Sequence, residues 1–128
     1  MKKLIFLFLI LTTITLWGCS SSGGGSNLIG TWNWIQQQTQ PGPQENRGNM
    51  VVTNVSGSNF IGTITWTSPN PSPPYNFEGI ITGVTARVAY THGNIEEVWT
   101  INFTGNSFSG NWVGTDGTAG TITGTKVS

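Results

Sequence analysis

Side chains alternate with a period of two residues over most of this chain, and this alternation most constrains how the chain folds. Aromatic residues and glycine occupy one set of alternate positions, and threonine and asparagine occupy the other. In residues 60–67 the first set is Phe60, Gly62, Ile64 and Trp66, and the second is Ile61, Thr63, Thr65 and Thr67. Successive side chains of a β-strand point to opposite faces, so the pattern predicts strands with one aromatic face.

Turn residues recur about every 8–12 positions and no helical period is present, which is typical of an all-β barrel or sandwich. We expect strands over Ile29–Gln38, Met50–Val55, Asn59–Thr67, Asn76–Val84, Arg87–Thr91, Glu96–Thr104, Ser107–Gly114 and Thr118–Lys126. The break after the fourth segment is the weakest, because Thr85-Ala86 is a poor turn sequence. Seven strands, one of them long and bent, is therefore an open alternative.

An aromatic face needs covering, and the chain offers no helix to cover it. Charged residues make up only 8% of the chain, against about 25% in an ordinary protein, so open strand edges would be poorly protected from aggregation. Closing the sheet removes the edges. We predict an antiparallel up-and-down barrel of about eight strands, with a β-sandwich as the alternative. Inward glycines at 62, 79, 83, 110, 120 and 124 would leave room for large aromatic side chains or for a ligand.

Gly30-Thr31-Trp32 at the start of the first strand resembles the Gly-x-Trp opening of lipocalins and related barrels. The resemblance implies that Trp32 packs at the closed end of the barrel under a basic residue from a late strand. Lys126, inward by parity, is the residue that matches this role.

The N-terminus has the pattern of a secretion signal. Lys2 and Lys3 precede an apolar run from residue 4 to residue 16, which is shorter than the about 20 residues of a membrane span. Leu16-Trp17-Gly18-Cys19 resembles the bacterial lipobox, with Trp17 where a small residue is usual. An ordinary signal peptide cleaved nearby is the alternative.

The resemblance to the lipobox implies a signal peptide over residues 1–18 and a lipidated Cys19 with a Gly/Ser tether over 19–26. The barrel domain would then comprise residues 27–128. Several acyl chains, palmitate among them, would hold Cys19 in a membrane more firmly than one chain would. The protein would then lie in a bacterial cell envelope, and Ser20 after the cysteine favours the outer membrane where the host has two.

The charged residues argue against several function classes. Residues 19–128 hold three cations, too few for a phosphate-binding patch, so we expect no nucleic-acid partner. His92 is the only histidine and Cys19 the only cysteine, which disfavours a metal site, a disulfide and a catalytic triad. We expect His92 to be exposed in a turn. These considerations predict a monomer without enzymatic activity and without a cofactor.

Glu97 shares the parity of Trp99, so it either points inward near a barrel mouth, paired with Arg87 or Lys126, or lies solvated at a strand end. The residues predicted to contact a ligand are Trp32, Trp34, Gln36, Trp66, Trp99, Phe103, Trp112 and Glu97. They favour a non-catalytic binding module for a small apolar or aromatic ligand. The alternative is a filled-core interaction protein that contacts another envelope component through loops Thr39–Asn49 and Ser68–Tyr75, which point away from the membrane.

Overall fold

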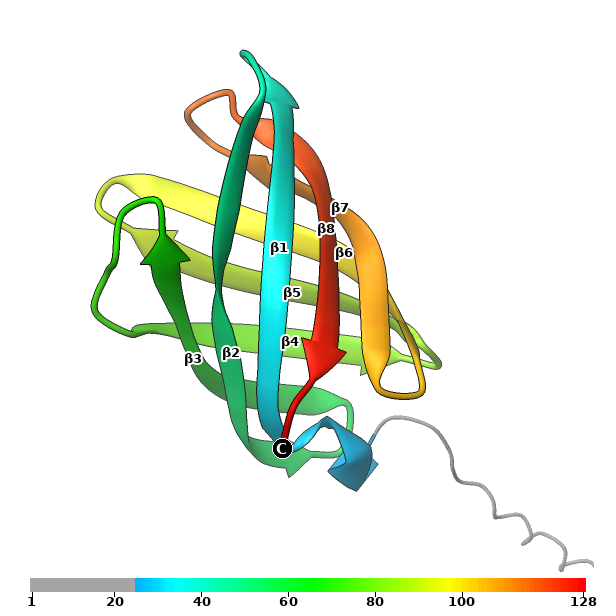
Figure 1. Cartoon of the computed structure of the whole chain (residues 1–128). Helices are drawn as coiled ribbons and strands as arrows, with labels where there is room; N and C mark the ends of the chain where they lie inside the picture. The colour runs from blue at the N-terminus through cyan, green and yellow to red at the C-terminus, as the bar shows by residue number, and fades with distance from the viewer. Residues whose placement is uncertain (1–24) are drawn as a thin grey trace, which may run out of the picture.

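The computed structural model describes residues 25–128, so the predicted signal peptide, Cys19 and the first part of the tether lie outside the described residues. A short 3₁₀ helix, η3 (Gly25–Leu28), leads into the first strand. The strands are β1 (Gly30–Gln40), β2 (Gln44–Ser56), β3 (Asn59–Ser68), β4 (Tyr75–Thr82), β5 (Thr85–His92), β6 (Ile95–Thr104), β7 (Ser107–Gly114) and β8 (Ala119–Lys126). Each pairs antiparallel with the next, and β8 pairs with β1 to close the barrel (Figure 1). The predicted up-and-down barrel is confirmed. In the described part of the chain, no helix is long and apolar enough to cross a membrane.

The turn between β4 and β5 settles the number of strands at eight. Gly83 has a φ of 64°, a left-handed conformation that glycine adopts without strain. The chain therefore reverses at residues 83–84, and the pairing of Thr82 with Thr85 begins the next hairpin. Gly83 is consequently an exposed turn residue, and its predicted inward position is wrong.

The predicted long loop at residues 39–49 is also wrong, because β1 and β2 continue almost to their shared turn at residues 41–43. Gln37 pairs with Glu45 across the two strands, and the Gln37 side chain donates a hydrogen bond of 3.0 Å to the Glu45 carboxylate. Both strands carry mainly polar side chains in this segment, so it shows no alternation of apolar residues that would predict a hairpin. Only Ser68–Tyr75 remains as a long loop, at residues 69–74.

Aromatic rings fill the barrel and occupy the space left by inward glycines. A Cβ atom added at Gly79 would overlap the ring of Phe60, and one at Gly124 would overlap the ring of Phe108. Gly48, which we did not expect to face inward, lies in the same way against the indole of Trp34. The buried apolar residues are Leu28, Trp32, Trp34, Met50, Val52, Phe60, Ile64, Phe77, Ile81, Ala86, Val88, Tyr90, Trp99, Ile101, Phe103, Phe108, Trp112 and Ile122.

The barrel is closed at the end where the chain enters and leaves, which we call the near end (Figure 1). The indole of Trp32 is 1% exposed and donates a hydrogen bond of 2.9 Å to the Leu28 carbonyl of η3. Lys126 Nζ lies 6.0 Å from the Trp32 ring centroid and donates a hydrogen bond of 2.8 Å to the Asn27 carbonyl. The Trp–basic pairing implied by the lipocalin resemblance is thus present.

Candidate binding site

The loops after β1, β3, β5 and β7 gather at the opposite end of the barrel, which we call the far end (Figure 1). The longest of them, residues 69–74, is held against β3 by Ser72. Its backbone N–H donates to the Trp66 carbonyl at 3.0 Å, and its hydroxyl accepts from the Trp66 backbone N–H at 3.0 Å. This loop therefore forms a fixed rim beside the Trp66 indole.

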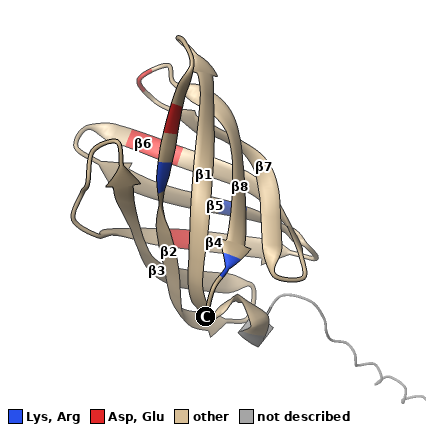
Figure 2. Cartoon of the chain, in the orientation of Figure 1, with Lys and Arg blue, Asp and Glu red and all other residues tan. Residues whose placement is uncertain are grey.

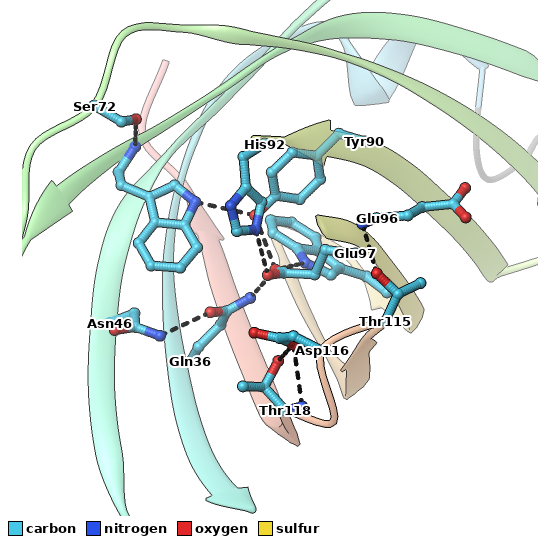
Figure 3. A network of polar contacts seen from close by, with 12 residues as sticks. Gln36, Asn46, Ser72, Tyr90, His92, Glu96, Glu97, Thr115, Asp116 and Thr118 are labelled. Atoms are coloured by element: carbon cyan, nitrogen blue, oxygen red, sulfur yellow. Dashed lines mark hydrogen bonds and ion pairs between the residues drawn. The ribbon is translucent and has the colours of Figure 1, made fainter. Parts of the chain in front are cut away.

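Glu97 of β6 is the centre of a polar network just inside the far end (Figure 3). Its side chain is buried, and Oε1 accepts hydrogen bonds from Gln36 Nε2 at 2.5 Å, Tyr90 OH at 2.8 Å and Trp99 Nε1 at 2.8 Å. Its other oxygen, Oε2, lies 3.2 Å from His92 Nε2. Buried carboxylates need this kind of pairing, since an isolated one would be strongly unfavourable.

The predicted partners of Glu97 are wrong, although its inward direction is confirmed. Arg87 is exposed on β5, where its parity is opposite to that of Tyr90. Lys126 lies at the near end, against Trp32. The solvated alternative is wrong as well, because Glu97 is only 1% exposed. The Glu97 carboxylate is hydrogen-bonded by the neutral side chains of Gln36, Tyr90 and Trp99 and contacted by His92, and not by the Arg or Lys that was expected.

The His92 imidazole sits among three aromatic rings. Its centroid lies 5.2 Å from that of Trp66, 5.8 Å from that of Tyr75 and 5.4 Å from that of Tyr90. We call these three residues the His92 cage. The side chain of His92 is 18% exposed, so the predicted solvent-exposed position is wrong: the strand continues through His92, and the turn begins after it. Trp66 and Tyr75 are partly buried and leave aromatic surface at the mouth of the barrel.

Tyr90 links the cage to the carboxylate. Burial and the negative charge of Glu97 raise the pKa of the Tyr90 phenol far above its usual range. The phenol therefore keeps its proton at neutral pH and donates to Glu97, while it accepts a hydrogen bond of 3.0 Å from Trp66 Nε1.

The structure separates the eight predicted ligand-contacting residues into groups. The polar network and the His92 cage bring together four of them: Gln36, Trp66, Glu97 and Trp99. The ring centroid of Trp34 lies 5.5 Å from that of Trp99. Trp32 and Phe103 are in contact with each other, 5.1 Å apart by centroids, near the closed end. Trp112 pairs with Trp99 across β6 and β7. The eight residues therefore do not line a single site.

The buried indole N–H groups of Trp34 and Trp112 have no hydrogen-bond partner among residues 25–128. An unpaired buried donor is unfavourable by about 1–3 kcal/mol. Both tryptophans belong to the predicted ligand-contacting set, and Trp34 packs edge-on against Trp66, with centroids 6.0 Å apart.

Sequence reasoning did not select Asn46, Tyr75, Tyr90 or His92 as site residues. Tyr90 carried a usable signal, because it shares its parity with the inward Val88. Asn46 carried none, because it lay in the segment expected to be a loop. Its amide donates to Gln36 Oε1 at 3.2 Å and so orients the amide that binds Glu97.

The network offers hydrogen-bonding groups beneath partly exposed aromatic surface. Within residues 25–128, no cluster of three or more His, Cys, Asp or Glu side chains could hold a metal ion. The partly exposed rings of Trp66, Tyr75 and His92 offer a face on which a flat molecule could stack.

No protein-family model matches this chain, and no curated protein matches it. Solved structures do match its fold. A redesigned β-barrel aligns with a TM-score of 0.68 and 20% identity over 80% of this chain and 94% of the design. A second redesigned barrel, mFAP0, bound to DFHBI, aligns with a TM-score of 0.61 and 24% identity over 78% of this chain and 99% of the design. A de novo designed fluorescence-activating β-barrel aligns with a TM-score of 0.62 and 13% identity over 79% of this chain and 94% of the design. At these identities the likeness establishes the small closed barrel and nothing further.

Proposed function

We propose that this protein is a membrane-anchored lipoprotein of a bacterial envelope, whose barrel is a non-catalytic binding module for a small apolar or aromatic ligand. The observation that carries the proposal is the far end, where partly exposed aromatic rings stand over a buried polar network. Small-molecule sites commonly combine apolar walls with a few fixed polar groups.

The anchor is supported by the direction of the chain. Cys19 precedes η3 by a few residues, and η3 lies at the near end with the C-terminus (Figure 1). An acylated Cys19 would therefore hold the near end toward the lipid and leave the far end facing away from it. Similar solved barrels include one bound to the small molecule DFHBI, which supports a binding role for this architecture.

A ligand at the mouth is favoured over one deep in the barrel, because aromatic rings already lie against the inward glycines. Trp66 and Tyr75 would contact such a ligand directly. Gln36 and Glu97 would orient its polar groups through the network beneath.

Native mass spectrometry of the full mature chain, purified from a bacterial envelope, tests the ligand. We expect the wild type to carry an added mass that is lost on denaturation. In Trp66→Ala, a smaller fraction of the protein should carry this mass. Ile61→Ala, an exposed outward residue of β3, is the matched control and should retain the mass. A bare mass for the wild type, from its native host as well as from an expression host, would contradict the binding proposal.

The mass of the N-terminal peptide tests the anchor separately. We expect cleavage before Cys19 with acyl groups on that residue, and loss of both in Cys19→Ser. A mature N-terminus elsewhere, with a free thiol, would overturn the lipoprotein proposal without affecting the ligand proposal.

A filled-core interaction protein is the second candidate, and the packing of rings onto Gly79 and Gly124 favours it. In that case the far-end loop at 69–74 would contact another envelope component. A photo-crosslinking residue at Asn70 should then give a defined protein adduct, and the same residue at Asn106, in the near-end turn between β6 and β7, should not. No adduct from position 70 would count against this candidate.

A further inference from the structure

The side chain of His92 fills its cage in the manner of a bound ligand. A planar ring lies among Trp66, Tyr75 and Tyr90. It directs one nitrogen at the Glu97 carboxylate, 3.2 Å away (Figure 3). His92 is the last residue of β5, and its side chain is part-exposed at the mouth. Rotation of that side chain into solvent would empty the cage without unpairing the strands.

The two oxygens of Glu97 have unequal partners. Oε1 accepts three hydrogen bonds, whereas Oε2 has only the contact with His92 Nε2. If His92 leaves, Oε2 faces the cage without a donor, which is unfavourable in a buried site. Any molecule that replaces the imidazole must therefore bring an N–H or O–H group to this oxygen.

The charge around the mouth favours a cation. Four of the five carboxylates of the chain lie toward the far end (Figure 2). They are Glu45 at the start of β2, Glu96 and Glu97 at the start of β6, and Asp116 in the β7–β8 turn. Arg47, a cation in the same half, is already bound to Glu45 at 2.6 Å, whereas Lys126 lies at the near end. The Thr118 hydroxyl donates a hydrogen bond to Asp116 and holds the pKa of that carboxyl below its usual range, so Asp116 is negatively charged at neutral pH. A mouth of one charge sign raises the local concentration of ligands of opposite sign.

We propose that the His92 cage binds a planar aromatic cation with N–H donors, such as an amidinium or imidazolium group, which takes the place of the His92 side chain and donates to Glu97 Oε2. The inference rests on the proposed binding function and adds the charge and donor chemistry of the ligand. Aromatic rings attract a cation through their faces, and a charge-assisted hydrogen bond to a buried carboxylate is stronger than a neutral one. A neutral apolar ring would leave Oε2 unpaired.

Benzamidine and benzamide test this directly, because they have nearly the same shape and differ in charge. Calorimetric titration of the purified mature protein at neutral pH should show benzamidine binding at least about tenfold more tightly than benzamide. His92→Ala should strengthen benzamidine binding by about tenfold or more, because the competing imidazole is gone. Thr91→Ala, on the outward face beside it, is the matched control and should change neither affinity.

Each other result has a definite meaning. Equal binding of the two compounds overturns the cation inference and leaves a neutral aromatic ligand, as in the proposed function. Failure of both to bind, in the wild type and in His92→Ala, overturns the inference, while the native mass measurement decides the proposed binding function separately. In the His92→Ala background, Glu97→Gln should reduce benzamidine to the affinity of benzamide. An unchanged benzamidine affinity in that double variant would overturn the role of the carboxylate. The comparison of the two compounds on the wild type stands even if that variant does not fold.

Discussion

At the residue scale, tryptophans of the same barrel have different tasks. Trp32 is 1% exposed and closes the near end, with its indole N–H bound to Leu28 and its ring under Lys126. Trp66 is only partly buried and has one edge in the mouth, where it contacts His92 and donates to Tyr90. The same residue type therefore fills the core at one end and leaves aromatic surface at the mouth of the other.

This difference predicts unequal losses of stability. Trp32→Ala should lower the free energy of unfolding by about 3–5 kcal/mol, because it leaves a large cavity in a packed core. Trp66→Ala should lower it by less than about 2 kcal/mol, because part of the ring is already hydrated. Urea unfolding followed by circular dichroism measures both, and equal losses would contradict the distinction between core and mouth.

Tyr90 predicts a dependence of stability on alkaline pH. Its pKa in the folded protein is raised by burial and by Glu97, while in the unfolded chain it is about 10. Above that value the folded state holds one more proton than the unfolded state. The contribution of Tyr90 to the free energy of unfolding is thus fully present below about pH 10. Above about pH 10, the free energy of unfolding falls by up to about 1.4 kcal/mol per pH unit.

Tyr90→Phe isolates this effect. The variant should be less stable at neutral pH, since Glu97 loses a donor, and its stability should decline less steeply between about pH 9 and about pH 11. Urea unfolding of both proteins across that range is the measurement. The same alkaline slope in wild type and variant would show that Tyr90 does not titrate on unfolding.

At the scale of elements, neighbouring strands fit by placing a ring against a glycine. Phe108 of β7 lies opposite Gly124 of β8 and covers the space where a side chain would stand. Phe60 of β3 covers Gly79 of β4 in the same manner. This complementarity fixes which residues of adjacent strands face each other, because a shift of register would bring rings against side chains.

Gly124→Ala tests the fit, because its added methyl would overlap the Phe108 ring. We expect a loss of about 1–3 kcal/mol in the free energy of unfolding. Combining it with Phe108→Leu should give a smaller loss than the sum of the two single changes. Gly42→Ala, in the β1–β2 turn with no atom near the added carbon, is the control and should change stability by less than about 0.5 kcal/mol. Additive losses in the pair would contradict direct contact.

At the scale of the whole molecule, η3 and the C-terminus lie at the near end, and the loop at 69–74 and most carboxylates lie toward the far end (Figures 1 and 2). An up-and-down barrel with an even number of strands necessarily brings its two ends together. With an anchor at Cys19, this topology would direct the mouth away from the lipid and let a ligand reach it.

Single-cysteine labelling tests that orientation, since Cys19 is the only native cysteine and acylation would consume its thiol. A fluorophore at Ser128→Cys should be quenched by a headgroup-attached quencher when the lipidated protein is in vesicles. The same fluorophore at Asn94→Cys, in the far-end turn between β5 and β6, should be quenched much less. Equal quenching at the two positions would contradict an upright barrel.

Most of the fold was predictable because it rests on local rules. The faces of β3, β6, β7 and β8 follow from the two-residue alternation, and closure follows from an aromatic face with no helix to cover it. The β1–β2 hairpin was not predictable in this way, because Asn46 is an inward polar residue and Gly48 an inward glycine. Neither gives an apolar signal.

Sequence parity places Glu97 on the same face of its strand as Trp99, because the direction of a strand side chain depends only on its position along the strand. The tertiary structure was needed to show that this position is buried and which groups the carboxylate meets there. Gln36 lies 61 residues away in the chain and reaches Glu97 only because the sheet closes. Tyr90 and His92 reach it through the register of β5 against β6. The direction of a side chain is a local property of its strand. The hydrogen-bond partners of Glu97 come from other strands, so they depend on barrel closure and on the register between strands, which the sequence of one strand does not specify.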